Sequence, residues 1–324
     1  MTLVPEQLLM RGFQCGPVAI ELVCDAVWLE RLSGELRMFD VPFEGRRMSL
    51  RIQVGVDMPP PPAVCGGYLQ CGRFKADRRA ETYVMVAQSA WCRFDASSRC
   101  AQVFALDRGE DAAEDVEQFL IFAMVWGWRA AGWVHMHAAT LVCAGRCALV
   151  CAESQGGKST FTAGCLRRGF QTLGDDKLLI RPGVPAHAYG LSSSMNLDPA
   201  VARWFPEIGG ISAIAPYSRW TPKRKVRIES LWPGATCRHA LPSLLLKLRR
   251  TTQGPPVALE PMADQDVLPA LARQTVIPND REAAALMLPA IMQLATQMRG
   301  WVVTLSPEAY SDPENLRVID GLFA

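Results

Sequence analysis

The sequence lacks the features that would direct the chain into a membrane, out of the cell or onto nucleic acid. Its most apolar run, residues 119–128, is too short to span a bilayer, and Arg129 closes it. The first residues, MTLVPEQLLMRGF, have neither the charged head nor the apolar core of a secretory signal. The formal net charge is only +2, which gives no general attraction to nucleic acid or to a membrane surface. We therefore expect a cytoplasmic protein with no nucleic acid or membrane partner.

Disulfide and metal-binding patterns are also scarce. The chain has eleven cysteines, an odd number, without a CxxC pair, and only four histidines. Cys143, Cys147 and Cys151 are close enough in sequence to suggest a metal site, but no histidine-rich segment accompanies them. Buried thiols in a reducing compartment are the favoured interpretation.

The first third of the chain predicts a β-rich domain. A length of 324 residues is enough for two domains. Short runs rich in β-branched and aromatic residues, separated by turn residues, are typical of strands. They lie at 18–24, 48–56, 82–87, 91–94 and 101–106. We expect residues 1–110 to form a β-rich N-terminal domain that serves as a scaffold or reads a substrate.

A helix is predicted next, over residues 112–131. Asp111, Glu114 and Asp115 stand at its start, where acidic residues favour a helix N-terminus, and Gly132 is a typical stop. Its apolar run indicates burial. We expect residues 111–132 to connect the first domain to a second one over 133–324.

The second domain contains a glycine-rich segment, CAESQGGKSTF, at residues 151–161. It is similar to the phosphate-loop pattern G-x-x-x-x-G-K-[ST], except that Ala152 takes the place of the first glycine and Gln155 stands where glycine is common. Strand-like residues 137–141 and 147–151 precede it, and FTAGCLRRG, a helical run ending near Gly169, follows. This order of strand, loop and helix is the context that a phosphate loop requires.

The chemistry expected of this loop follows from its residue types. Backbone N–H groups from Gln155 to Lys158 would point at phosphate oxygens, and Gly156 and Gly157 leave room for them. Lys158 would reach the β- and γ-phosphates of a nucleotide, and the Ser159 hydroxyl would ligate Mg²⁺. The alternative is a surface turn that matches the pattern by chance.

Two adjacent acids, Asp175 and Asp176, lie in the run FQTLGDDKLLI, which we predict to be a strand. Neighbouring side chains of a strand point to opposite faces. One carboxylate would then face a metal, and the other an attacking hydroxyl or a supporting histidine. The alternative is a solvated acidic turn after Gly174.

Taken together, residues 136–181 resemble the catalytic core of the HPr kinase/phosphorylase family. His137 matches that family's strand histidine, Ser154, Gly157, Lys158 and Ser159 match its loop, and Asp175 with Asp176 match its acidic pair. The expected nucleotide-binding residues run from Ser154 to Thr160. The resemblance implies an α/β fold, in which a P-loop kinase domain with a mixed sheet flanked by helices follows the β-rich domain. It implies ATP and Mg²⁺ as cofactors, and it makes assembly into a homo-oligomer an expectation. It also implies specific roles: Asp175 as the base, His137 as its partner, Lys158 on the phosphates, and Asp176 with Ser159 at the metal.

The chain departs from that family after the acidic pair. The RGLGIIN-type signature of its bifunctional members is absent, and residues 190–197 share only a Gly-Leu and an asparagine with it. The chain is more similar to HPr-kinase-related serine kinases associated with ribosomally made peptides, some of which phosphorylate a lasso-peptide precursor. The expected activity is transfer of the γ-phosphate to a serine hydroxyl of a peptide or protein. A non-catalytic nucleotide sensor and a bifunctional kinase/phosphorylase are the alternatives.

Downstream, residues 221–229 (TPKRKVRIE) form a dense basic run near the predicted core. As a flexible loop it would clamp the γ-phosphate or hold an acidic peptide, with Lys223, Arg224 and Lys225 as candidates. A plain solvated loop is equally compatible with the pattern. The remainder predicts helices, notably over 280–299, and a late strand at 301–305.

Overall fold

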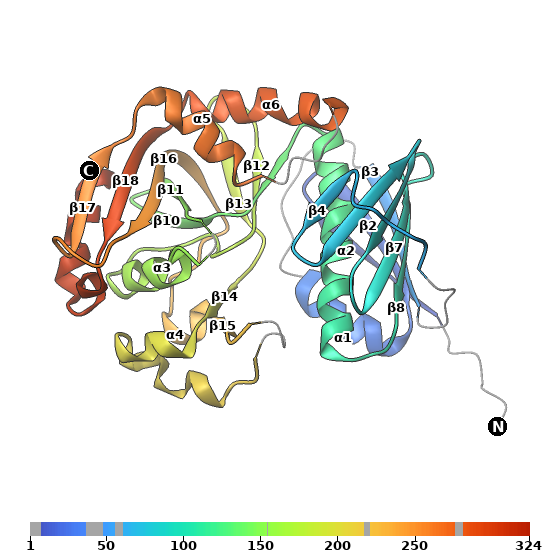
Figure 1. Cartoon of the computed structure of the whole chain (residues 1–324), viewed down its shortest axis with the longest axis horizontal. Coiled ribbons are helices and arrows are strands. Elements are labelled where there is room, and N and C mark those ends of the chain that lie inside the picture. Colours follow the sequence, from blue (N-terminus) through green and yellow to red (C-terminus); the bar gives the residue numbers. More distant parts are fainter. Residues whose placement is uncertain (1–7, 37–47, 56–60, 154, 217–220, 276–280) are drawn as a thin grey trace. The chain divides into compact units, whose positions relative to one another are not determined.

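The computed structural model describes residues 8–36, 48–55, 61–153, 155–216, 221–275 and 281–324. Its contacts divide the chain into two compact units (Figure 1). The first unit comprises Met1–Ala131 with Ile277–Leu286, and the second comprises Gly132–Val276 with Met287–Ala324.

The first unit is built on one eight-stranded sheet with the order β1-β2-β3-β8-β7-β6-β5-β4. Two neighbouring pairs, β2 with β3 and β3 with β8, are parallel, and the other pairs are antiparallel. All five strands predicted in this region are present, whereas β1, β4 and β5 were not predicted. The strands are β1 Leu9–Cys15, β2 Val18–Cys24, β3 Met48–Gly55, β4 Leu69–Cys71, β5 Phe74–Arg79, β6 Thr82–Val86, β7 Ala90–Asp95 and β8 Cys100–Ala105.

Two helices complete the first unit. In α1 (Ala26–Leu36), the Asp25 side chain caps the N-terminus by accepting a hydrogen bond from the Trp28 backbone N–H at 2.9 Å. The predicted buried helix is α2 (Glu110–Ala130), which contacts β2, β3, β7 and β8 of the sheet. Gly127 allows that close approach, because a Cβ at this position would lie 2.7 Å from Val18 Cγ2. The helix is thus part of the packing of the first unit.

The second unit has a mixed sheet with the order β10-β11-β16-β13-β12-β9, extended by β18 on β16 and β17 on β18. Its β11, β16 and β18 run parallel to one another, and the other neighbours are antiparallel. The predicted strand over 137–141 is instead two strands, β9 and β10, with His137 between them. The strands are β9 Val134–Met136, β10 Ala139–Cys143, β11 Arg146–Cys151, β12 Leu178–Arg181, β13 His187–Gly190, β16 His239–Arg250, β17 Val257–Pro261 and β18 Arg299–Leu305.

Helical segments cover both faces of this sheet. Adjacent side chains of β11 pack on opposite faces of the sheet. Leu149 lies in the core that includes Leu271 and Ile291, and Val150 lies in the core that includes Phe161 and Leu316. The α-helices are α3 Lys158–Arg167, α4 Ile228–Leu231, α5 Asp264–Ala272 and α6 Arg281–Ala295, of which α6 belongs to this unit only from Met287 on, and the 3₁₀ helices are η2 Pro199–Arg203, η3 Pro206–Ala213, η4 Pro307–Tyr310 and η5 Pro313–Phe323. The second unit is therefore a mixed α/β fold.

A small separate sheet pairs β14 (Ser194–Leu197) with β15 (Arg224–Arg227). The basic run at 221–229 was predicted to be a loop, and this prediction is wrong for residues 224–227. The reason is Val226, which is only 6% exposed and packs in a core with Met195 and Leu197. Within β15, this one buried side chain among basic ones packs the strand into the core.

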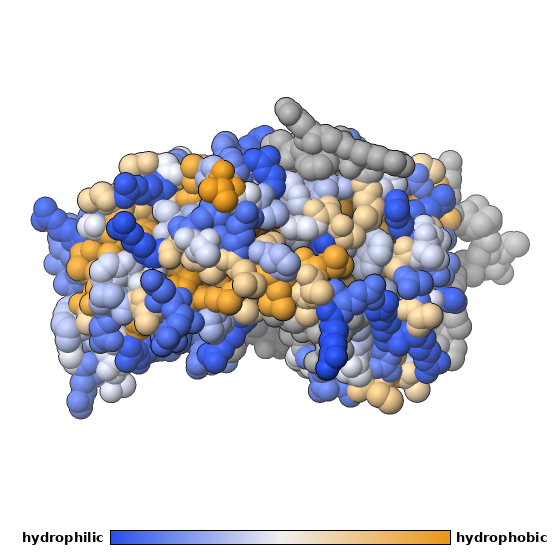
Figure 2. All heavy atoms as spheres, turned by 90° about the horizontal axis from the view of Figure 1, so that it is seen from above, coloured by the Kyte–Doolittle hydropathy of each residue, from blue (hydrophilic) through white to orange (hydrophobic). Residues whose placement is uncertain are grey.

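Figure 2 looks onto the side of the molecule that carries α6, where apolar side chains lie among polar ones at the surface. The exposed large apolar residues of this helix are Leu286, Leu288 and Met292. Across the described ranges, no helix has the length and apolar character needed to cross a membrane.

Candidate phosphate-binding and acidic site

The glycine-rich loop joins β11 directly to α3, as the sequence predicts. The strand ends at Cys151 and the helix begins at Lys158. Gln155 and Gly157 both have left-handed backbone conformations, with φ of 61° and 87°. Of the predicted loop residues, Gln155, Gly156 and Gly157 lie in this connection, and Lys158, Ser159 and Thr160 form the first turn of α3; Ser154 lies outside the described residues.

The alanine at the unusual loop position explains why Gly156 must be glycine. A Cβ added to Gly156 would lie 2.8 Å from the Cβ of Ala152 and 2.9 Å from the carbonyl oxygen of Glu153. The Gly156 N–H also donates a 2.8 Å hydrogen bond to that carbonyl. The loop therefore folds back on its own start, and the departure at position 152 is compatible with a compact turn.

Replacing Gly156 with alanine is expected to destabilise the protein by about 1–3 kcal/mol, because the added methyl group overlaps two neighbours. Chemical denaturation of the purified variant measures the loss. The matched control is Gly209→Ala, since a Cβ at Gly209 has nothing within 4 Å. Adding Ala152→Gly to Gly156→Ala should recover only part of the stability, because the Glu153 carbonyl remains. A Gly156→Ala protein as stable as the Gly209→Ala protein would contradict this geometry.

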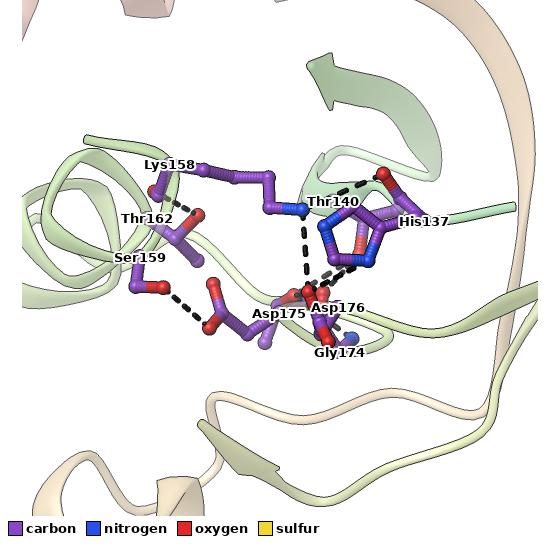
Figure 3. A network of polar contacts seen from close by, with 9 residues as sticks. His137, Thr140, Lys158, Ser159, Thr162, Gly174, Asp175 and Asp176 are labelled. Atoms are coloured by element: carbon purple, nitrogen blue, oxygen red, sulfur yellow. Dashed lines mark hydrogen bonds and ion pairs between the residues drawn. The ribbon is translucent and has the colours of Figure 1, made fainter. Parts of the chain in front are cut away.

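Lys158 and the two acids come from separate segments and converge in front of α3 (Figure 3). The Lys158 Nζ lies 3.3 Å from Asp176 Oδ1 and donates a 3.4 Å hydrogen bond to the backbone carbonyl of His137. The Lys158 side chain is only 12% exposed. The ammonium group thus links the helix to both the acidic turn and the segment between β9 and β10.

Asp175 is the buried acid of the pair, with 2% of its surface exposed. Its Oδ2 accepts a 2.7 Å hydrogen bond from the Ser159 hydroxyl. Its Oδ1 is also buried, and no described residue forms a hydrogen bond with it. Burial, and next the negative charge of Asp176, raise the pKa of Asp175 to about 6, although the Ser159 hydrogen bond and the charges of Lys158 and Lys223 oppose the shift.

Asp176 is the more accessible acid, with a side chain that is 33% exposed. Its Oδ1 lies 3.1 Å from His137 Nδ1. Partial desolvation raises the pKa of Asp176, but the charges of His137, Lys158 and Lys177 outweigh it and hold that pKa below its ordinary value. Loss of hydration, and next the charges of Lys158 and Lys223, lower the pKa of His137 against the opposing effect of Asp176. Asp176 is therefore a carboxylate at neutral pH.

This pairing corrects the one inferred from the resemblance. His137 contacts Asp176, not Asp175, and the Ser159 hydroxyl contacts Asp175, not Asp176. The acids also do not lie on a strand: they precede β12, which begins at Leu178. The reason is Gly174, whose φ of 155° turns the chain immediately before the pair.

Two buried threonines, which were not predicted from the sequence, hold this turn. The carbonyl of Gly174 accepts hydrogen bonds from the Thr140 backbone N–H at 3.1 Å and from the Thr172 hydroxyl at 3.0 Å. The two hydroxyl oxygens are 3.0 Å apart, and both residues are fully buried. Their position at the centre of apolar segments was the sequence signal for this role, because a buried hydroxyl group needs a hydrogen-bond partner.

The three predicted basic residues lie in different surroundings. The positive charge of Lys223 lowers the pKa of both His137 and Asp175. Arg224 donates a hydrogen bond to the backbone carbonyl of Pro222. Lys225 pairs with Asn196 across the small sheet. Of these three residues, only Lys223 has a charge that lowers the pKa of Asp175 and of His137.

The donor atoms at this site are those that Mg²⁺ prefers. Within the part of the chain that the structure describes, no group of three or more His, Cys, Asp or Glu side chains is placed to hold a metal by itself. Mg²⁺ commonly takes one or two protein oxygens and completes its shell with water and phosphate oxygens. The buried Asp175 Oδ1, which has no hydrogen-bond partner among the described residues, fits a cation beside the Ser159 hydroxyl.

Comparisons with known proteins give little beyond this geometry. No protein-family model matches the chain. No curated protein matches it either. Among solved structures, it is similar to the Hpr(Ser) kinase/phosphatase from Coxiella burnetii, with 12% sequence identity and a TM-score of 0.32 over 58% of this chain and 96% of that one. A likeness at this level says nothing about activity.

Proposed function

We propose that this protein is an ATP- and Mg²⁺-dependent kinase that transfers the γ-phosphoryl group to a serine hydroxyl of a peptide or protein. The observation that supports it is the convergence of Lys158 and Ser159, at the start of α3, with both acids and His137. A site that only binds phosphate needs the loop and the lysine. A transfer reaction also uses groups that hold the metal and that orient the acceptor hydroxyl, and two carboxylates in distinct surroundings can fill these roles.

The loop and the N-terminus of α3 would bind the β- and γ-phosphates through backbone N–H groups and Lys158. In the structure, the Lys158 ammonium group lies against Asp176. Phosphate binding would draw it toward the γ-phosphoryl oxygens, because a multiply charged anion attracts it more strongly than one carboxylate. That movement would leave Asp176 open to the acceptor.

We assign Asp175 and Ser159 to the metal. Asp175 is buried at the foot of the helix and its free oxygen has no competing hydrogen bond among the described residues. Bound Mg²⁺ would neutralise charge on the β- and γ-phosphate oxygens. Asp175 and Ser159 would hold it with one oxygen each.

We assign Asp176 to the acceptor. Its carboxylate is ionised and partly exposed, and His137 fixes its orientation from the side away from the loop. As the acceptor oxygen forms its bond to the γ-phosphorus, the bond from that phosphorus to the bridging oxygen of ADP breaks. Asp176 would accept the hydroxyl proton. The Asp175 carboxylate is less suited to this role, because it is buried and already accepts from Ser159.

A ribosomally made peptide, such as a lasso-peptide precursor, is the acceptor that the sequence resemblance favours. The experiment incubates the protein with ATP, Mg²⁺ and the small peptides encoded beside its gene, together with a serine-containing peptide library. Mass spectrometry then detects an added phosphoryl group. Phosphopeptide that requires both ATP and Mg²⁺ is the expected result. ATP binding without any transfer to these peptides, or to proteins of the same cell, would favour a nucleotide sensor instead.

A further inference from the structure

Arg250 lies beside the glycine-rich loop, although it comes from a much later segment of the chain. A Cβ added to Gly157 would lie 3.8 Å from the Cδ atom of Arg250. Gly157 is the last residue of the loop before α3, and its φ of 87° is left-handed. Arg250 was not predicted as a site residue, because nothing in its local sequence pattern connects it with the loop. The contact with Gly157 places it at the phosphate-binding end of α3.

The strands that carry the loop and Arg250 are parallel neighbours, so both end at the same edge of the sheet. The last residue pair between β11 and β16 is Cys151 with Lys247, and β16 continues to Arg250. Leu248 packs in the core that includes Phe161 of α3. Because alternate side chains of a strand lie on one face, Arg250 projects on the face that carries α3. Ligands of open α/β sheets commonly bind at this carboxyl edge.

The preceding residue, Arg249, has different surroundings. It lies on the other face of β16, and its Nη2 is 3.2 Å from Glu260 Oε2. Arg250 is exposed, and no acidic residue in the described part of the chain forms an ion pair with it. Lys158, the cation of the loop itself, is already 3.3 Å from Asp176. Arg250 therefore offers its guanidinium group to an anion bound beside the loop.

Arg250 and the acidic pair lie on opposite sides of the strand that leads into the loop. In the sheet order, β11 stands between β10 and β16. The turn before the acids is held to β10, because the Gly174 carbonyl accepts a 3.1 Å hydrogen bond from the Thr140 backbone N–H. Strands β10 and β16 are about 10 Å apart, which a chain of phosphates can bridge and a single phosphate cannot. A nucleotide whose γ-phosphate faces the acids would extend toward Arg250 with its α-phosphate.

We propose that Arg250 binds the α-phosphate of the nucleotide and makes the site selective for chains of three phosphates over chains of two. The proposal rests on the kinase function proposed above, since that function places the γ-phosphate at Asp176. A planar guanidinium group can donate two parallel hydrogen bonds to phosphate oxygens, which the ammonium group of a lysine cannot. Arg250 is a specificity-determining residue in this arrangement and takes no part in the proton transfer.

The test compares the binding of MgATP, magnesium tripolyphosphate and magnesium pyrophosphate to the full-length protein by isothermal titration calorimetry. Tripolyphosphate has the three phosphates of ATP without its nucleoside, and pyrophosphate fills only the two positions nearest the acids. We expect Arg250→Gln to weaken the two three-phosphate ligands about tenfold and pyrophosphate at most about twofold. Arg250→Lys should recover part of the loss, because it keeps the charge but not the paired hydrogen bonds. The matched control, Arg249→Gln, should change none of the three affinities.

Three results would overturn the proposal. Weaker binding of MgATP with unchanged binding of tripolyphosphate would place Arg250 at the nucleoside. Equal weakening of all three ligands would show a general effect of charge or of loop structure, because such an effect does not depend on the number of phosphates. Unchanged affinities in Arg250→Gln, or no binding of tripolyphosphate to the wild-type protein, would remove the α-phosphate contact.

Steady-state transfer gives a second readout. Arg250→Gln should raise the KM for MgATP about tenfold and leave kcat within about twofold, because the α-phosphate is held equally in the ground state and the transition state. A fall in kcat with an unchanged KM would contradict this role. If the wild-type protein bound the three ligands as predicted but transferred no phosphoryl group, the kinase function would fail while Arg250 remained a polyphosphate-binding residue.

Discussion

Replacing Asp176 with asparagine is expected to reduce the rate of phosphoryl transfer about 10²- to 10⁴-fold, the usual contribution of a general base. Nucleotide binding should survive, because Asp176 touches the Lys158 ammonium group but not the loop backbone. Release of Lys158 from the carboxylate should even tighten ATP binding severalfold. Single-turnover transfer and a separate ATP titration measure the two effects.

The matched comparison for this prediction is His137→Gln. The ring of His137 contacts Asp176 at 3.1 Å but lies outside the path of the transferred group. We expect a smaller loss of rate from its removal than from that of Asp176, because it positions the carboxylate and does not itself take the proton. Unchanged transfer in Asp176→Asn would remove the acid from the mechanism and favour the sensor interpretation.

Replacing Asp175 with asparagine is expected to stabilise the metal-free protein at neutral pH while abolishing Mg²⁺-dependent activity. The carboxylate is 2% exposed, and its Oδ1 has no partner among the described residues, so ionisation there is unfavourable. The pKa of Asp175 rises from 3.8 to about 6 on folding. A folded pKa above the unfolded value means that the folded state binds the proton more tightly. The stability is therefore present below pH 4 and is lost as the pH rises to about 6 and beyond.

From that shift, asparagine should raise the free energy of unfolding by about 1–3 kcal/mol at pH 7.5 and by little at pH 4. Denaturation at both pH values, without added metal, measures the difference. Asp176→Asn is the contrasting control: the pKa of Asp176 is lowered in the folded state, so its carboxylate contributes stability above pH 4 and its loss should destabilise. Destabilisation of the protein by Asp175→Asn at pH 7.5 would contradict the assignment of a strained, buried carboxylate.

Regular elements with a strong local pattern could be predicted from the sequence. The strand over Val18–Cys24 and the helix Glu110–Ala130 follow from β-branched alternation and from an apolar run with acidic residues at its start. In each case, local propensity and tertiary packing agree.

Elements whose pattern is set by distant contacts were missed. The longest strand of the second sheet, His239–Arg250, includes Pro242 and ends in charged residues, which hides a central strand. The strand Arg224–Arg227 consists of basic residues except for Val226, so only its packing against residues some thirty positions earlier reveals it. The strand propensity of a segment does not indicate which distant residues it packs against.

At the site, the residue types were predictable but their pairing was not. The lysine, the serine, both acids and His137 were all selected from the sequence, and the structure brings them together. Which acid faces which partner depends on the backbone turn at Gly174, and that turn depends on hydrogen bonds from Thr140 and Thr172. If Asp175 and Asp176 lay on a strand, their side chains would point to opposite faces of the sheet.

The assignment of Asp175 to the metal and of Asp176 to the acceptor is tested most directly by the effect of Mg²⁺ on ATP affinity. Isothermal titration of ATP would be performed with and without Mg²⁺ on the wild-type protein, Asp175→Asn and Asp176→Asn. We predict that Mg²⁺ tightens ATP binding in the wild type and in Asp176→Asn, and that the gain disappears in Asp175→Asn. Loss of the Mg²⁺ effect in Asp176→Asn, with its retention in Asp175→Asn, would contradict the account and place the metal on the other acid.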